Sequence, residues 1–325
     1  MTGSLEIWRQ VGLRSLGELA LPADLEALAV TDCRELVDLE AVASMSLLRS
    51  LDLSRCFALA DLTPLSALAD LRTLILDMGH TQNRGGAVDD FSPLATLVSL
   101  RRLELGSMFH LQQLDPLVGM EQLRRLGLKQ CRVLVDLSGI SGLERLESLD
   151  LRDCRTLTDI GPLASLTGLR TLHLGGCREL SSVAAVAAMH ALEELDLSGL
   201  PPVIDGAVLH GHPTLHSLSL RGCCTLDSIA GLAGGDRLEE VNLHGCRSLS
   251  NIEALAPHRG LRKLDLEGCC GVSSLEPLAS HRQLELLITQ GSGIRTVPPA
   301  LAAAAARGQD MVDCRDEAMD RYFGG

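Results

Sequence analysis

The sequence predicts an α/β solenoid, with parallel strands in one sheet on a concave side and short 3-10 or loop segments on a convex side. Three observations support this fold class. A 23-residue unit recurs along most of the chain, each unit opens with alternating apolar and polar residues, and only 2% of the 325 residues are aromatic although 46% are hydrophobic. Period-two alternation is typical of a strand with one buried face. A fixed repeat of small aliphatic residues indicates stacked turns and not one large globular core.

The repeating unit is clearest over residues 146–168, which read LESLDLRDCRTLTDIGPLASLTG. Its central apolar residue recurs every 23 residues, apart from a single interval of 29. The series is Leu28, Leu51, Leu74, Leu103, Leu126, Leu149, Leu172, Leu195, Leu218, Val241, Leu264 and Leu287. We therefore expect twelve repeats over residues 25–297, with a six-residue insertion near 80–87.

The second half of each unit returns the chain to the start of the next strand. Segments such as DLTPL at 61–65 and DIGPL at 159–163 contain a proline. Proline fixes φ near the helical value and removes a backbone donor, which suits a tight turn or a single 3-10 turn. One isolated unit buries too few side chains to offset its ordering entropy, so the turns must stack on one another.

Both ends of the chain depart from the repeat, and each is expected to cover an exposed apolar end of the stack. Residues 1–24 are predicted to form an amino-terminal cap and residues 298–325 a carboxy-terminal cap. The apolar residues expected to cover the first turn are Ile7, Trp8, Val11, Leu13, Leu16 and Leu19.

Most of the eleven cysteines occupy one position of the repeat. These eight are Cys33, Cys56, Cys131, Cys154, Cys177, Cys223, Cys246 and Cys269. A cysteine that points inward once per turn acts as a small apolar residue with a weak S–H donor, so we expect buried free thiols. No CxxC pair occurs, and the sequence predicts neither a metal site nor a cofactor.

The repeat resembles the leucine-rich repeat, whose pattern L-x-x-L-x-L-x-x-[N/C]-x-L spans 20 to 29 residues. The D-[LI]-x-P-L return segments are similar to bacterial repeats of the internalin type. The cysteine followed by arginine, as in Cys131-Arg132 and Cys154-Arg155, resembles the repeats of nucleotide-binding immune-type receptors. No G-x-x-x-x-G-K-[ST] motif is present, so this chain carries no NTPase half of such a receptor.

The charge balance narrows the classes of partner. A formal net charge of −13 does not favour a general nucleic-acid or acidic-membrane binder, which presents a basic face. The chain has no 18-residue apolar run, and its start has neither a basic region nor an apolar region of signal-peptide type. We expect a monomeric bacterial protein of the cytoplasm.

Candidate binding residues lie at the outward positions of the strands and around the insertion. The strand positions put Asp150, His173 and Asp196 in one row and Arg221, His244 and Glu267 in another. A basic island in repeats four and five comprises Arg101, Arg102, Arg124, Arg125, Lys129 and Arg132, near Met78, Met108, Phe109 and the insertion, while Phe91 is expected in the core. The full candidate set is Met78, His80, Asn83, Arg84, Arg102, Glu104, Met108, Phe109, Arg125, Lys129, Asp150, Arg152, His173, Asp196, Arg221, His244, Asp265 and Glu267.

These observations favour a non-enzymatic module that binds a protein of unknown identity through its concave face and the insertion. One alternative is the sensor part of a bacterial defence-type receptor, separated from its NTPase. Another is an enzyme or effector that uses Asp150, His173 and Asp196, or Cys314. The histidine row lacks a nucleophile and a pocket, and only eleven residues follow Cys314, so we predict no catalytic residues.

Overall fold

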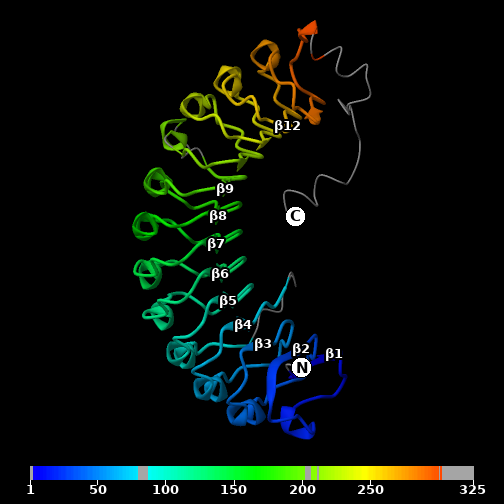
Figure 1. The fold of residues 1–325 in the computed structure, drawn as a ribbon, viewed down its shortest axis with the longest axis vertical. Helices are drawn as coiled ribbons and strands as arrows, with labels where there is room; N and C mark the ends of the chain where they lie inside the picture. Colours follow the sequence, from blue (N-terminus) through cyan, green and yellow to red (C-terminus); the bar gives the residue numbers. More distant parts are fainter. Residues whose placement is uncertain (1–2, 80–86, 202–205, 211, 300, 302–325) are drawn as a thin grey trace. The chain divides into compact units, whose positions relative to one another are not determined.

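The computed structural model describes residues 3–79, 87–201, 206–210, 212–299 and 301. The chain forms two compact units, residues 1–169 (unit 1) and 170–325 (unit 2). In each unit short parallel strands lie along one side and 3-10 helices along the other (Figure 1). No helix in the described part of the chain is long and apolar enough to cross a lipid bilayer.

Unit 1 contains seven of the described strands. They are β1 (Gly3–Trp8), β2 (Leu25–Thr31), β3 (Ser50–Asp52), β4 (Thr73–Ile75), β5 (Arg102–Glu104), β6 (Arg125–Gly127) and β7 (Ser148–Asp150). The 3-10 helices are η1 (Leu16–Glu18), η2 (Glu40–Ser44), η3 (Thr63–Ala67), η4 (Ser92–Thr96), η5 (Asp115–Leu117), η6 (Ser138–Ile140) and η7 (Gly161–Ser165).

Unit 2 repeats the arrangement with six described strands. They are β8 (Thr171–His173), β9 (Glu194–Asp196), β10 (Ser217–Ser219), β11 (Glu240–Asn242), β12 (Lys263–Asp265) and β13 (Leu286–Ile288). The 3-10 helices are η8 (Ala184–Ala188), η9 (Gly206–Leu209), η10 (Ala230–Gly234), η11 (Glu253–Leu255) and η12 (Glu276–Leu278).

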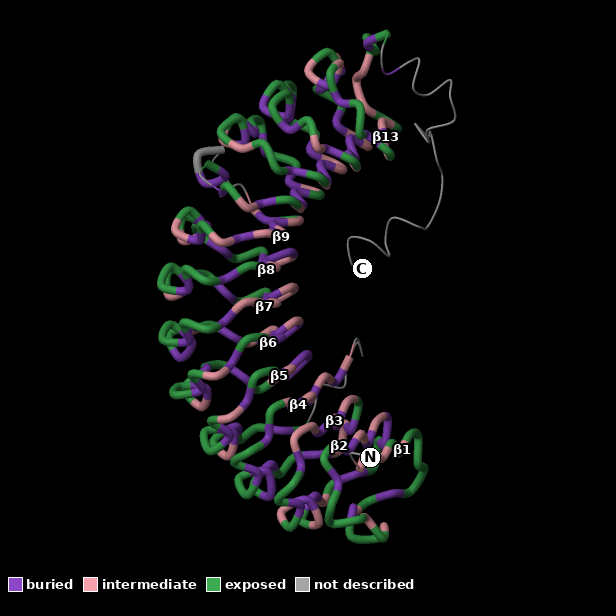
Figure 2. Tube along the Cα trace, viewed as in Figure 1, coloured by how far each residue is buried: buried purple, intermediate pink, exposed green. Residues whose placement is uncertain are grey.

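The strand register follows the 23-residue period. Leu51 of β3 pairs with Leu28 of β2 and with Leu74 of β4, so each central leucine faces its counterpart in the next turn. The six-residue insertion does not disturb this register, because Leu74 pairs with Leu103 across it. All twelve residues of the predicted series are buried. Figure 2 shows the same alternation of buried and exposed residues in one turn after another.

The return segments form 3-10 helices, as the prolines predict. Proline occupies one of the first two positions of η3, η4, η5, η7 and η12. An aspartate just before several of these helices accepts a hydrogen bond from a backbone amide, as Asp61 Oδ1 does from Thr63 N at 2.8 Å. This bond satisfies one of the unpaired donors at the start of the helix.

One residue per turn adopts a left-handed backbone conformation, immediately before the cysteine position. In unit 1 these residues carry side chains: Asp32, Arg55, Ser107, Gln130 and Asp153. In unit 2 they are all glycines: Gly176, Gly199, Gly222, Gly245, Gly268 and Gly291. The turn that precedes the insertion differs by one residue, because Gly79 is left-handed there and Met78 is not.

The eight repeat cysteines are buried free thiols, as predicted. At least six of them donate from Sγ to the carbonyl oxygen 26 residues earlier, at 3.0–3.2 Å. Each bond joins one turn to the turn before it. Burial raises the pKa of Cys56 and of Cys131 to about 12, so both stay protonated at neutral pH.

The amino-terminal cap differs from the prediction in two ways. Residues 3–8 form β1, which pairs in parallel with β2 and extends the sheet of unit 1. Leu13 and Leu16 are buried, but Trp8 is 63% exposed and Val11 94% exposed, so neither of these two covers the core. Trp8 occupies the outer side of the β1 alternation, where the Arg9 guanidinium lies 4.4 Å from its ring centroid. Most of the expected carboxy-terminal cap lies outside the described residues.

Candidate functional site

The strand face of each unit is the surface formed by the outward side chains of its strands. An aspartate or asparagine at the end of a strand accepts a hydrogen bond from the backbone amide two residues later. Asp52, Asp150, Asp196, Asn242 and Asp265 all make this bond, at 2.8–3.0 Å. The bond fixes the carboxylate or amide against the strand end, so these side chains have little freedom.

On the strand face of unit 1 charged side chains form ion pairs, and neighbouring glycines leave room for these side chains. Lys129 Nζ lies 2.8 Å from Asp77 Oδ2. Gly106 lies between them in the sheet, and a Cβ there would be 2.5 Å from Asp77 Oδ1. Glu104 likewise lies over Gly127, and Arg102 Nε binds its Oε1 at 3.0 Å. Three of the predicted binding residues, Arg102, Glu104 and Lys129, are therefore members of internal pairs.

A row of arginines precedes the strands of unit 1. We call Arg49, Arg72, Arg101 and Arg124 the arginine ladder, because backbone bonds join each of them to the next. Arg49 pairs with Asp70 at 3.3 Å, and Arg124 pairs with Glu147.

Two members of the ladder, Arg72 and Arg101, are exposed and make no ion pair with any described residue. The same is true of Arg125, which pairs in register with Arg102 on the neighbouring strand.

The predicted basic island is thus two separate groups. Lys129 follows Arg125 by four residues, a distance of about 13 Å along an extended chain. Lys129 and Arg132 lie past the end of β6, whereas the arginines at 101, 102, 124 and 125 lie at its start and at that of β5. Arg132 lies against Phe109, 5.8 Å from the ring centroid.

The exposed methionines expected beside these arginines are buried. Met108 takes the cysteine position itself and is fully buried. Gly79 takes that position in the turn before the insertion and has no side chain to fill it. Met78 fills the interior in its place and is also fully buried. Both methionines belong to the core, as does Phe91, whereas Phe109 is half-buried. His80, Asn83 and Arg84 lie outside the described residues.

In unit 2, His173 and Asp196 are paired in register on β8 and β9. The His173 imidazole contacts Glu194 instead, with Nε2 2.9 Å from Glu194 Oε1. Asp196 Oδ1 accepts hydrogen bonds from Ser198. Asp150, the third member of the predicted row, belongs to unit 1, where Arg152 binds its carboxylate.

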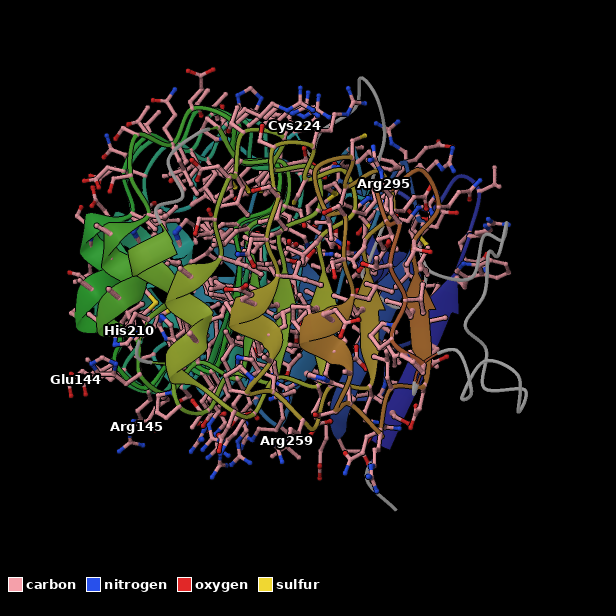
Figure 3. All side chains as sticks on the ribbon, turned by 90° about the horizontal axis from the view of Figure 1, so that it is seen from above. Glu144, Arg145, His210, Cys224, Arg259 and Arg295 are labelled. Carbon is pink, nitrogen blue, oxygen red and sulfur yellow. The ribbon has the colours of Figure 1, made fainter. Side chains whose placement is uncertain are left out.

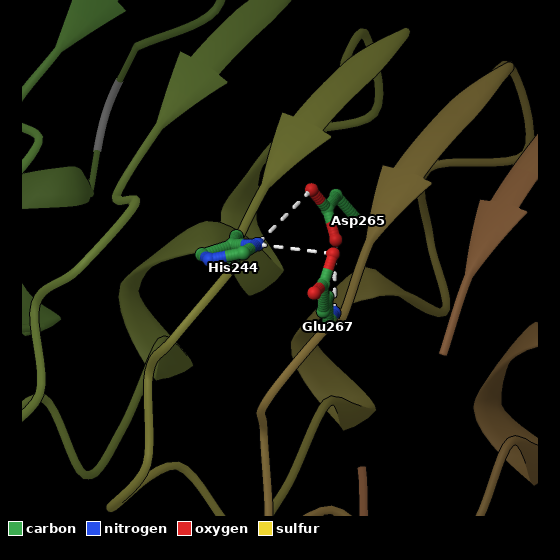
Figure 4. A group of neighbouring side chains, drawn as sticks. All are labelled: His244, Asp265 and Glu267. Carbon is green, nitrogen blue, oxygen red and sulfur yellow. Dashed lines mark hydrogen bonds and ion pairs between the residues drawn. The ribbon is translucent and has the colours of Figure 1, made fainter. Parts of the chain in front are cut away.

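Two members of the second predicted row, His244 and Glu267, lie close to Asp265, and these three form a group of potential metal ligands in the described chain (Figure 4). His244 Nδ1 lies 3.4 Å from Glu267 Oε2 and 3.8 Å from Asp265 Oδ2. Asp265 was expected at the surface, but it is buried, because its side chain lies against the strand end. Burial raises the pKa of Asp265 above its usual range. Arg221 is exposed and lies one turn before His244.

In unit 2 the loops at the two ends of the strands lie at opposite edges of the unit (Figure 3). In Figure 3 Cys224, which follows a strand of unit 2, lies at one edge, and Arg259, which precedes one, lies at the other. Cys224 and Cys270 are exposed thiols, each next to a buried repeat cysteine.

Sequence reasoning missed two groups of buried polar residues. Asp32 is buried in unit 1 and accepts bonds from Arg34 and Arg9, at 2.9 Å and 2.8 Å, with Arg55 at 3.5 Å. These arginines, Arg34 first, hold the pKa of Asp32 below its usual range. A signal was present, since Asp32, Arg55 and Arg9 are spaced by 23 residues.

The second group consists of three buried histidines in unit 2, His212, His258 and His281. They fill the apolar core position that Met189 occupies one turn before His212. Each contacts a backbone carbonyl oxygen through Nε2, at 2.9–3.2 Å. Desolvation lowers the pKa of all three.

Comparison with known proteins identifies the fold. No family model matches the chain, and no curated protein matches it in sequence. An internalin (inlF) from Listeria monocytogenes is similar in structure, with a TM-score of 0.79 and 22% identity over 97% of this chain and 88% of that one. A leucine-rich repeat protein of Leptospira interrogans gives a TM-score of 0.57 and 17% identity, over 90% and 85% of the two chains.

The functional domain of InlJ from Listeria monocytogenes, described as including a cysteine ladder, also gives a TM-score of 0.57. Its identity is 18%, over 85% of this chain and 60% of that one. These similarities confirm a leucine-rich repeat solenoid that resembles the internalins. At such low identity they concern the fold alone.

Proposed function

We propose that this leucine-rich repeat solenoid is a non-enzymatic recognition module that binds an acidic segment of a partner protein. The binding surface consists of the strand face of unit 1 and the arginine ladder beside it. The observation that carries the proposal is the accumulation of three exposed cations, Arg72, Arg101 and Arg125, that pair with no acidic group of the described residues, in a chain whose net charge is −13.

Like charges on adjacent turns repel one another, which lowers the stability of the fold. A role in binding an acidic partner would account for arginines at these positions. Strand spacing puts ladder neighbours about 5 Å apart at the backbone. At the corresponding positions of unit 2 the two arginines stand beside glutamates and pair with them, Arg170 with Glu193 at 2.7 Å and Arg262 with Glu285 at 2.8 Å. Unit 1 retains cations that a carboxylate-rich partner would neutralise.

The adjoining strand face is suited to binding because its side chains are already fixed. The pair between Lys129 and Asp77 and the pair between Arg102 and Glu104 hold long side chains in one geometry. Binding therefore immobilises fewer rotamers, and less of the interaction free energy is lost to ordering. Fixed acids and free arginines together define a pattern that a partner must complement in charge and in spacing.

The test is a triple charge reversal, R72E/R101E/R125E, in the full chain. The probe is a fluorescent Asp/Glu-rich peptide, followed by anisotropy at low and at physiological salt. We expect the variant to bind at least about tenfold more weakly, equal to 1.4 kcal/mol, and the salt dependence of the parent to be lost. Affinity capture with mass spectrometry then identifies the partners that the parent retains and the variant loses.

The matched control is R237E/R259E/R282E, which makes the same change in net charge at three exposed arginines of unit 2. We expect this control to bind the peptide and the captured partners with little change. Equal losses in both variants would show that net charge alone matters, and unchanged binding by the ladder variant would contradict the proposal.

A further inference from the structure

We propose that His244, Asp265 and Glu267 form a binding site for a divalent transition-metal ion such as Zn²⁺ on the strand face of unit 2. The three residues come from two adjacent turns, with His244 and Glu267 at the same position of successive repeats. Their donor atoms are one imidazole nitrogen and two carboxylate oxygens, a donor set that zinc accepts.

The donor atoms are already close to metal-binding spacing. All three lie within 4.8 Å of one another, and His244 Nδ1 lies 3.4 Å from Glu267 Oε2. Ligands bound at 2.0–2.2 Å in a tetrahedral site stand about 3.4 Å apart. The side chains of His244 and Glu267 are 32% and 40% exposed and can turn toward the ion, while Asp265 is held by its bond from Glu267 N.

Asp265 gives an independent reason to place a cation here. Its side chain is only 6% exposed, and Oδ1 accepts the hydrogen bond from Glu267 N at 2.8 Å. Its Oδ2 points toward His244 Nδ1 at 3.8 Å, which is too long for a hydrogen bond. Among the described residues no donor binds Oδ2. The charged form of a carboxylate with so little exposure is costly to desolvate, and a cation bound at Oδ2 offsets that cost.

The local charge also suits a divalent ion. Asp265 and Glu267 supply two negative charges, and Arg221 one turn earlier supplies one positive charge, which leaves the group anionic with a neutral histidine. Lys263, on the same strand as Asp265, lies 2.6 Å from Glu240 Oε1. Three protein ligands leave a fourth position for water or for a group of a partner.

The protein provides its own comparison at His173. This histidine also lies on the strand face of unit 2 and contacts one carboxylate, Glu194, at 2.9 Å. Its neighbour Asp196 has Oδ1 bound by the backbone amide and hydroxyl of Ser198. A histidine beside a carboxylate is thus present at both places, but among the described residues only His244 belongs to a group of three potential ligands.

The experiment is calorimetric titration of the full chain with ZnCl₂, in a C224S/C270S/C314S background that removes thiols outside the repeat positions. We expect one saturable site in this parent and a rise in its unfolding temperature with zinc, since binding to the folded state alone stabilises it. Replacement of zinc by Co²⁺ should give d–d absorption bands.

The variants H244Q and E267Q should each lower the zinc affinity by about 10- to 100-fold or more. Loss of a residue that only hydrogen-bonds to a metal ligand already lowers metal affinity by about that factor, and these variants remove a ligand itself. H173Q should leave it unchanged. Unfolding in EDTA checks that all variants keep the stability of the parent without metal. A parent with no saturable site would overturn the assignment. So would zinc binding that both ligand variants retain, or that H173Q weakens equally.

Discussion

Lys129 Nζ and Asp77 Oδ2 lie 2.8 Å apart although a complete turn of the solenoid separates them. The intervening turn contributes Gly106, which has no side chain to occupy the space. A Cβ at Gly106 would lie 2.5 Å from the Asp77 carboxylate. At Gly106 a contact on this surface therefore reaches to the second neighbouring turn, and the charge of Lys129 is already partly neutralised before any partner arrives.

Thiol accessibility gives a direct check of the core assignment. A thiol-specific reagent applied to the native protein should modify Cys224 and Cys270 and spare the eight repeat cysteines, which are buried. Burial also raises the pKa of Cys223 and of Cys269 to about 11, so little thiolate is present to react. Peptide mass spectrometry after labelling measures this. Native modification of Cys223, adjacent to Cys224, would show that the turn opens readily.

Asp32 should be more important for stability than its counterpart Asp153, which has the same left-handed backbone. Asparagine tolerates the same conformation, so an Asp-to-Asn substitution leaves the backbone unstrained while it removes the charge and turns one acceptor oxygen into a donor NH₂ group. Asp32→Asn weakens charged hydrogen bonds to Arg9 and Arg34, and we expect a loss of about 1–3 kcal/mol. Asp153 pairs with Arg155 at the surface, so Asp153→Asn should cost less than about 1 kcal/mol. Urea unfolding of both variants measures the two losses in the free energy of unfolding. Equal losses would contradict the special role of Asp32.

The left-handed glycines of unit 2 should not tolerate a side chain without cost. Gly245 has φ of 74°, and its Cα lies beside that of Gly222. We expect Gly245→Ala to lower the free energy of unfolding by about 1–2 kcal/mol, the cost of a left-handed L-residue. Gly260 has open space around it and no left-handed backbone, so Gly260→Ala should be neutral or slightly stabilising. Similar effects of the two substitutions on urea unfolding would refute the backbone argument.

Unit 2 should lose stability in mild acid because of His212, His258 and His281. The folded state lowers their pKa by desolvation, so these side chains stay neutral when the same groups of the unfolded chain gain protons. The unfolded state then binds more protons, and stability falls as pH drops below about 6.5, by at most about 1.4 kcal/mol per histidine per pH unit. Carboxylates with a lowered pKa, such as Asp32, change the stability with pH only near and below pH 4.

Thermal unfolding between pH 7.5 and pH 5 measures how steeply the stability falls with pH. A variant with an apolar residue at the same core position tests its origin. His281→Leu is the best choice, since His281 Nδ1 has no hydrogen-bond partner and leucine occupies this position in other turns. The variant should show a shallower decline than the parent. An unchanged slope would assign the acid sensitivity to other groups.

The periodic part of this structure was predictable because it depends on one turn and its immediate neighbour. The leucine series, the strand register, the 3-10 return segments and the buried cysteines all follow from the 23-residue period. A side chain that repeats at one position must meet its copy in the next turn, and this single constraint determines the core.

The rest depends on local exceptions that the period does not describe. Met78 is buried because the left-handed residue moves by one position to Gly79, and no pattern of hydrophobic residues reveals a backbone dihedral. Asp265 is buried because its carboxylate binds the amide of Glu267. Trp8 is exposed because β1 extends the sheet and turns alternate residues outward. Each of these cases departs from the burial that the position of the residue in the sequence predicts.

The insertion after β4 has a practical consequence for protein engineering. Leu74 and Leu103 keep the same register as every other pair, although six additional residues separate them. On one side Gly79 donates its backbone amide to Asp77, and on the other Val88 is fully buried. We expect changes in the length or sequence between these two anchors to leave the register of Leu74 and Leu103 unaltered. The same property makes this turn a suitable place to graft a foreign epitope.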